Sequence, residues 1–385
     1  MRRALWVFAA AFGGYLVSSG FGHTAYDNYV LLANAWVHGS LTVADPGPAI
    51  DALHYMGRYY IIEAPLPAVL MLPLVALFGT AANQSLVCVV CGAVAVAAAD
   101  AMFGRMELSA GGRYTALAAF ACGTVLWWCT AFGAVWMYAH VAGVMFAMLA
   151  LAELYGARRP WLVGLLLACA ALSRLPMALA IPPMLWWVTQ DCDGRLKARR
   201  FWAFVAGAAP LFVAYAAYNF ARWGTPLDIG YTVWYHQDQV GQPTGSPFRL
   251  EYLPFNLYSF LMLAPDFARN FPWLRPSSFG VSLTLTSPML LLALAAPRGC
   301  ERRPLGIAAL LVAAPSMLYY VNGFEQFGMR HSLDFMPFLM PLVGRGLGRV
   351  PSGLAMPLVV SSIAANAYGM WYSWAYHAYS VVPRS

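Results

Sequence analysis

The chain has 385 residues, of which 61% are hydrophobic and only 10% are charged, and its formal net charge is +7. So few charged residues exclude an ordinary soluble domain and predict a polytopic membrane protein. The basic residues are scattered through short segments between apolar runs, so they indicate membrane topology and no nucleic-acid partner. The seven cysteines lie in apolar runs or short arginine-rich segments, which argues against a disulfide framework and a zinc site.

Apolar runs of a length suited to a bilayer follow one another along the chain. The first, residues 4–20, lacks a signal-peptide cleavage pattern and is predicted to be an uncleaved span. Further single spans are predicted at 83–103, 114–131, 135–155, 201–221, 281–296, 305–321, 332–344 and 352–374. Residues 161–189 are too long for one span and are broken at Ser173-Arg174-Leu175-Pro176, which predicts a hairpin of two short helices.

The fold class predicted from these runs is an all-α polytopic membrane protein with about eleven transmembrane helices in a single domain, residues 1–385. Residues 64–79 are apolar but short and proline-rich. A span there would move basic loops to the outer side, so an interfacial or re-entrant helix is predicted instead. The outer face then carries a first loop, 21–63, and a large loop, 222–280.

The first outer loop contains a predicted amphipathic helix that begins at Thr24 and ends at Gly39. Its apolar face is formed by aromatic and aliphatic residues, and its polar face by Asp27, Asn34 and His38. Asp27 has two interpretations. Its carboxyl group either faces an aqueous cleft where chemistry could take place, or forms a capping box with Thr24 that only satisfies backbone donors.

Further ionisable residues stand near the ends of the apolar runs. Glu63 follows Arg58 by five residues, and it either holds a cation or forms an interfacial ion pair with that arginine. Arg174, between two apolar helices, needs a partner or an aqueous cavity, and a lipid phosphate would serve. Arg330 and His331 form a second candidate phosphate site, or Arg330 extends to the membrane interface as a belt residue.

Three more predicted site residues are aromatic or imidazole side chains. His140 lies at the outer end of a span, as a binding residue or as a member of the interfacial belt. Tyr231 and Trp234 belong to the aromatic-rich loop 222–280, where rings either stack on sugars or anchor the chain at the interface. Asp45 and Asp51 flank a Pro-Gly-Pro segment and are predicted to be turn residues.

Five segments resemble the GT-C class of integral-membrane glycosyltransferases, which use polyprenyl-phosphate sugars. They are HTAYDNYVLLANAWVHGSLTVAD, GRYYIIEAPLPAVLMLP, ALSRLPMAL, AYNFARWGTPLDIGY and FGMRHSLDFMPFL. The resemblance implies that Asp27 is the general base and that transfer inverts the anomeric centre. Glu63 stands where lipid A aminoarabinose transferases have an acid before a lysine and two prolines, but Ala64 replaces that lysine here.

That departure leaves Arg58, Arg174 or Arg330 to bind the phosphate. Many members of the class also place an acid between the third and fourth spans, where this chain offers only His140. A divalent metal is therefore possible but not favoured, and no other cofactor is expected. The C-terminal soluble domain that several members use for acceptor recognition is not expected either.

The sequence thus predicts an inverting glycosyltransferase at the outer face of a bacterial cell membrane. Its partners would be the lipid bilayer, a polyprenyl-phosphate sugar donor, and a glycan, lipid or protein acceptor. Because polyprenyl phosphate is a good leaving group, the protein needs one base for the acceptor and cations for the departing phosphate. A flippase or transporter of lipid-linked sugars, and a catalytically idle membrane subunit, are the alternatives.

Overall fold

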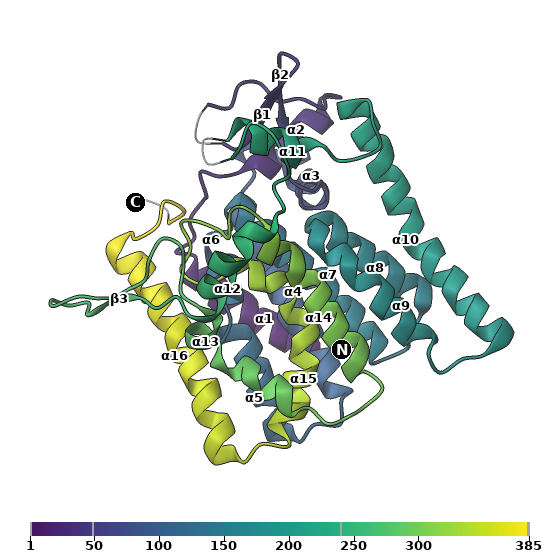
Figure 1. Cartoon of the computed structure of the whole chain (residues 1–385), viewed down its shortest axis with the longest axis vertical. Coiled ribbons are helices and arrows are strands. Elements are labelled where there is room, and N and C mark those ends of the chain that lie inside the picture. The colour runs from purple at the N-terminus through teal and green to yellow at the C-terminus, as the bar shows by residue number, and fades with distance from the viewer. Residues whose placement is uncertain (1, 48–49, 239–240, 383–385) are drawn as a thin grey trace.

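The structure, a computed structural model, describes residues 2–47, 50–238 and 241–382. It is a bundle of packed helices with a smaller cap at one end, built from α2, α3, α11 and a β-hairpin (Figure 1). The helices and strands, in chain order, are α1 (Arg2–Ser18), α2 (Asn28–Val37), β1 (Ala52–Tyr55), β2 (Arg58–Ile61), α3 (Leu66–Phe78), η1 (Gly79–Ala81), α4 (Gln84–Gly104), α5 (Ala110–Cys122), α6 (Leu126–Phe132), α7 (Val135–Leu154), α8 (Pro160–Ser173), η2 (Leu175–Ala180), α9 (Ile181–Thr189), α10 (Gly194–Trp223), α11 (Gly230–Gln237), η3 (Leu250–Tyr252), α12 (Leu253–Leu261), β3 (Asp266–Phe267), β4 (Leu274–Arg275), α13 (Leu283–Thr286), η4 (Pro288–Ala295), α14 (Arg302–Leu318), η5 (Arg330–Asp334), α15 (Met336–Leu347) and α16 (Ser352–Tyr376).

The helical content agrees with the predicted all-α membrane class. In the described part of the chain, α4, α7, α10 and α16 are each long and apolar enough to cross a membrane. The α5–α6 pair, bent by 47°, would make a fifth crossing if it counts as one span. The predicted number of about eleven therefore stays a prediction, because helices such as α8 and α9 are apolar but short.

The predicted break in residues 161–189 is present. Helix α8 ends at Ser173, Arg174 adopts an extended backbone conformation, and η2 starts at Leu175 with Pro176 in its first turn. A proline is favourable at a helix start because its missing N–H would have no intrahelical partner there. The break therefore holds Arg174 between two helices instead of inside one.

Residues 21–63, the predicted first outer loop, differ from the prediction in two ways. Helix α2 starts only at Asn28, because the Thr24 hydroxyl accepts a hydrogen bond from the Tyr26 N–H instead of capping the helix. Strands β1 and β2 form a hairpin that was not predicted, with Met56 and Gly57 both at positive φ in its turn. That geometry matches the twist of a two-residue hairpin.

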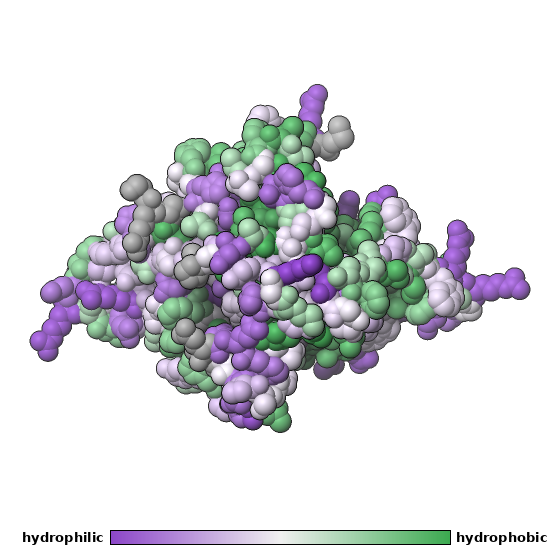
Figure 2. Space-filling model, turned by 90° about the horizontal axis from the view of Figure 1, so that it is seen from above, coloured by the Kyte–Doolittle hydropathy of each residue, from purple (hydrophilic) through white to green (hydrophobic). Residues whose placement is uncertain are grey.

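The hairpin is held against the cap by a small apolar cluster. Leu53, Tyr60 and Ile62 are buried with Trp223 at the end of α10. The chain leaves β2 directly into Glu63, so this packing fixes where that carboxyl group lies. Seen from above, hydrophilic residues are spread among apolar ones over this end of the molecule (Figure 2).

Candidate functional site

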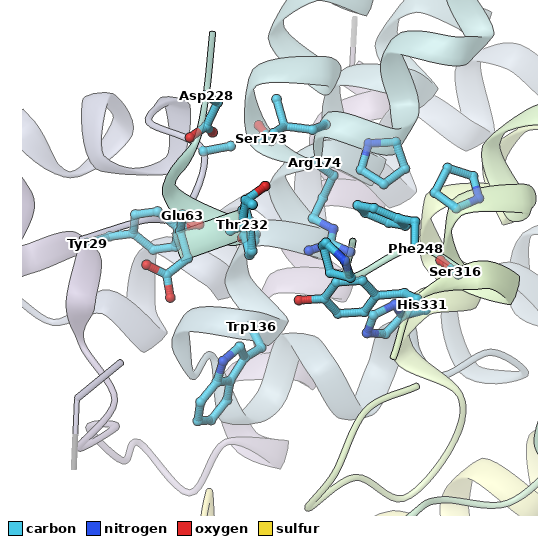
Figure 3. A pocket seen from close by; sticks show the side chains of 18 residues that line it. Tyr29, Glu63, Trp136, Ser173, Arg174, Asp228, Thr232, Phe248, Ser316 and His331 are labelled. Atoms are coloured by element: carbon cyan, nitrogen blue, oxygen red, sulfur yellow. The ribbon is translucent and has the colours of Figure 1, made fainter. Parts of the chain in front are cut away.

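A cavity of about 230 Å³ lies below the cap, where segments distant in the sequence meet (Figure 3). Its walls come from the segment 29–64, α7, the α8–η2 break, α11, α14 and η5. The lining residues are Tyr29, Glu63, Ala64, Trp136, Ala139, Ser173, Arg174, Leu175, Pro176, Asp228, Tyr231, Thr232, Pro247, Phe248, Pro315, Ser316, Tyr319 and His331.

One wall carries an arginine held by a buried acid. Arg174 donates from Nε to Asp334 Oδ1 at 3.1 Å and from Nη2 to Asp334 Oδ2 at 3.0 Å. His140 Nδ1 lies 2.7 Å from the same Oδ1 atom. Asp334 and His140 are fully buried, whereas the Arg174 side chain is 18% exposed and lines the cavity. The paired bonds fix the plane of the guanidinium group, so it faces the cavity in one orientation.

Two further groups of this wall follow one another in η5. His331 lines the cavity, and its ring centroid is 5.2 Å from that of His140. Arg330 is buried but does not line the cavity. Its Nη1 donates to the Phe324 carbonyl and to Gln326 Oε1, and its guanidinium lies 5.9 Å from the Trp136 ring centroid. Arg330 is therefore placed behind the wall and not on it.

An acid forms the other side of the cavity (Figure 3). Glu63 is only 6% exposed, and its Oε1 accepts a hydrogen bond from Asn28 Nδ2 at 3.2 Å. Its Oε2 has no hydrogen-bond partner among the described residues. Burial, together with the nearby Asp51 carboxyl group, raises the pKa of Glu63 to about 8.

Asp51 supports this acidic side. It accepts a hydrogen bond from Trp136 Nε1 at 2.9 Å, and burial raises the pKa of its carboxyl group. Asp51 therefore does more than form a turn. Asp45 does act as a turn residue, because its Oδ1 accepts from the Gly47 N–H.

The predicted base, Asp27, lies outside this cavity. It precedes α2 and lines a separate hollow of about 630 Å³ with Asn34, His38 and Asp45. Its side chain makes no capping hydrogen bond, and partial burial raises the pKa of its carboxyl group. The polar face predicted for this helix is present, but it faces a hollow different from that of Glu63 and Arg174.

The other predicted residues divide between the cavity and its surroundings. Tyr231, on α11, lines the cavity. Trp234, on the same helix, packs against the apolar cluster under the hairpin and does not line it. Arg58 is exposed on β2 and makes no ion pair within the described chain. The interpretation of Arg58 as the ion-pair partner of Glu63 is therefore wrong, because Arg58 is exposed at the turn end of β2 and Glu63 is buried beyond the other end of that strand.

Several residues of the site were not predicted, among them Asp334 and Asn28. Asp334 belongs to the segment FGMRHSLDF, and an acid inside an apolar stretch was a signal that it has a buried partner. Asn28, next to Asp27, gave no such signal, because its role depends on contacts with Glu63 and Asp51.

The described residues contain no group of three or more His, Cys, Asp or Glu side chains placed to hold a metal ion. No family model, no curated protein and no solved structure matches this chain. The chemistry of the cavity is therefore the basis on which a function can be assigned.

Proposed function

We propose that this protein is an inverting glycosyltransferase that transfers a sugar from a polyprenyl-phosphate donor to an acceptor hydroxyl group at the outer face of a bacterial cell membrane. One observation carries the proposal. A single small cavity has an oriented arginine and a histidine on one side and a carboxyl group with a free oxygen on the other.

The cationic side suits the donor phosphate. Arg174 is fixed by Asp334, and its Nη1 has no partner among the described residues, so it is free to bind a phosphate oxygen. His331 adds an imidazole on the same wall. A fixed guanidinium stabilises the charge that develops on the departing phosphate without reorganising during the reaction.

The acidic side suits the acceptor. In the proposed step, Glu63 Oε2 takes the proton of the acceptor hydroxyl group while the oxygen of that hydroxyl group forms the new bond to the anomeric carbon. The bond from that carbon to the phosphate oxygen breaks, and polyprenyl phosphate leaves with the electron pair. A carboxyl group with a pKa of about 8 is a stronger base than an exposed carboxylate, which suits this role.

This assignment moves the base from Asp27 to Glu63. Glu63 lines the cavity with Arg174 and His331, whereas Asp27 lines the other hollow. The resemblance to GT-C glycosyltransferases implies Asp27 instead, so the two acids are competing candidates for the same role.

The test is release of polyprenyl phosphate from synthetic polyprenyl-phosphate sugars by purified protein in lipid, with a membrane glycan extract as acceptor. Wild type, Glu63→Gln and Asp27→Asn are compared for release and for donor binding. We expect release by wild type and its loss in Glu63→Gln with binding retained. Donor binding by wild type without release from any donor would contradict the proposal and favour a lipid-linked sugar transporter or an idle subunit.

A further inference from the structure

Three buried oxygen atoms gather where the first outer loop meets the cavity. Asn28 Oδ1, the Tyr29 hydroxyl oxygen and Glu63 Oε2 are all inaccessible to solvent and have no hydrogen-bond partner among the described residues. Tyr29 and Glu63 line the cavity, and Asn28 is hydrogen-bonded to Glu63. A buried polar atom without a partner is costly, so three of them beside one cavity indicate a ligand that supplies the missing bonds.

The orientation of Asn28 determines what these atoms can bind. Its amide nitrogen donates to Glu63 Oε1 at 3.2 Å and to the Asp51 carbonyl at 3.3 Å, so its oxygen is the atom left free. The free atoms are thus an amide oxygen, a carboxyl oxygen and a phenol oxygen, all of which accept hydrogen bonds. Arg58, the basic residue nearest to Glu63 in the sequence, is exposed on the hairpin and gives this wall no positive charge.

The charges and the size of the cavity further limit the kind of ligand that it can bind. Asp51 lies close enough to disfavour ionisation of Glu63, and this effect exceeds the opposite effect of Arg174 across the cavity. A carboxylate group placed against Glu63, away from Arg174, would therefore be repelled. A volume of about 230 Å³ is below the range of sites for drug-sized ligands, and it suits one small ring.

We infer that Asn28, Tyr29 and Glu63 form a subsite for the hydroxyl groups of an uncharged carbohydrate and that this subsite rejects acidic sugars. The inference deepens the proposed function and depends on it for the role of the cavity. The hydroxyl groups bound in this subsite could belong to the transferred sugar or to the acceptor, because both have the same chemistry. The experiment below distinguishes these two sources.

The test variant is Tyr29→Phe, which removes one of the three oxygens and keeps the ring. Its matched control is Tyr138→Phe. The Tyr138 ring contacts that of Tyr29 edge-on with centroids 5.5 Å apart, but its hydroxyl donates to the Pro67 carbonyl and not toward the cavity. An effect of Tyr29→Phe that exceeds that of Tyr138→Phe therefore reports on the ligand and not on the packing of the rings.

Binding is measured with three probes: polyprenyl phosphate without a sugar, the same lipid carrying a neutral hexose, and the same lipid carrying a hexuronic acid. We expect wild type to bind the hexose compound more tightly than the hexuronic compound. If the subsite holds the donor sugar, Tyr29→Phe weakens hexose binding about fivefold and leaves sugar-free binding unchanged. If it holds the acceptor, Tyr29→Phe instead raises the KM for the acceptor by a similar factor.

Equal wild-type affinity for the hexose and hexuronic compounds, together with an acceptor KM that Tyr29→Phe leaves unchanged, would overturn the inference. So would a Tyr29→Phe protein that matches Tyr138→Phe both in donor binding and in acceptor KM. Sugar-dependent binding that needs Tyr29, in a protein that never transfers the sugar, would support the subsite while contradicting the proposed transferase. The two failures are therefore distinguishable.

Discussion

Replacing Asp334 by Asn is expected to destabilise the protein and to weaken donor binding. The Asp334 carboxylate is fully buried and accepts two hydrogen bonds from Arg174. The Nδ1 atom of His140 also lies at hydrogen-bond distance from it. Asn has nearly the same shape, but it leaves the Arg174 charge without its counterion. Removing one partner of a buried ion pair costs about 3–5 kcal/mol, because the other charge remains desolvated.

The measurement is chemical or thermal unfolding of the purified protein in lipid, followed by donor binding for variants that remain folded. Asp191→Asn is the matched control. Asp191 is 56% exposed at the side chain and pairs with Arg158 at 3.3 Å, and exposed pairs contribute about 1 kcal/mol or less. The same change of residue type is thus made once in a buried pair and once in an exposed one.

A double variant separates charge from packing. Arg174→Met combined with Asp334→Asn removes both charges, so it should recover a large part of the stability lost in Asp334→Asn while donor binding stays weak. If Asp334→Asn unfolds like wild type, or if the double variant is less stable than both single variants, the reasoning from a buried ion pair is refuted.

Five further predictions concern the cavity and the two competing acids. Glu63→Gln should lower the transfer rate at least about a hundredfold, as measured by polyprenyl phosphate release, because no base remains. Since the Glu63 pKa is raised to about 8, transfer should increase with pH up to that value in wild type and lose this dependence in Glu63→Gln. Between pH 4.5, the ordinary pKa of a glutamate, and about pH 8, Glu63 keeps its proton in the folded protein but loses it in the unfolded chain. The free energy of unfolding should therefore fall as pH rises through this window. Glu63→Gln should flatten that slope. Asp27→Asn should keep transfer within a few-fold of wild type, and a loss as large as that of Glu63→Gln would return the base to Asp27. Arg174→Lys should weaken donor binding about tenfold by equilibrium binding, because lysine cannot keep two bonds to Asp334 while it faces the phosphate.

Much of the helical fold could be predicted because a membrane segment is recognisable from its own residues alone. An apolar run is visible in the sequence whatever its neighbours are, and α4, α7 and α16 coincide closely with the predicted runs. The break at Arg174 was also local, since Pro176 disfavours a continuous helix through this region. The hairpin was missed because its strands are only four residues long each, which is too short for a clear alternating pattern.

The partnerships in the site could not be predicted in the same way. Asp334 is 160 residues from Arg174 and 194 residues from His140, and no spacing rule connects them. In the sequence, Arg174 needed a partner and Asp334 was available, but several other acids were available too. Only the packing of η5 against α7 and α14, which brings Asp334 to Arg174 at the end of α8, selects the pair.

The choice between Asp27 and Glu63 likewise depends on three-dimensional packing and not on local sequence pattern. Both acids lie in the first outer loop, and the resemblance to GT-C enzymes gives each a role, so local pattern could not rank them. Burial and neighbours do rank them. Glu63 is buried, keeps one oxygen free and shares a cavity with Arg174, whereas Asp27 is only partly buried in a hollow whose lining contains no arginine. A base for this transfer must lie across the sugar from the cation that holds the phosphate. Among the acids of this loop that line a described cavity, Glu63 meets that requirement.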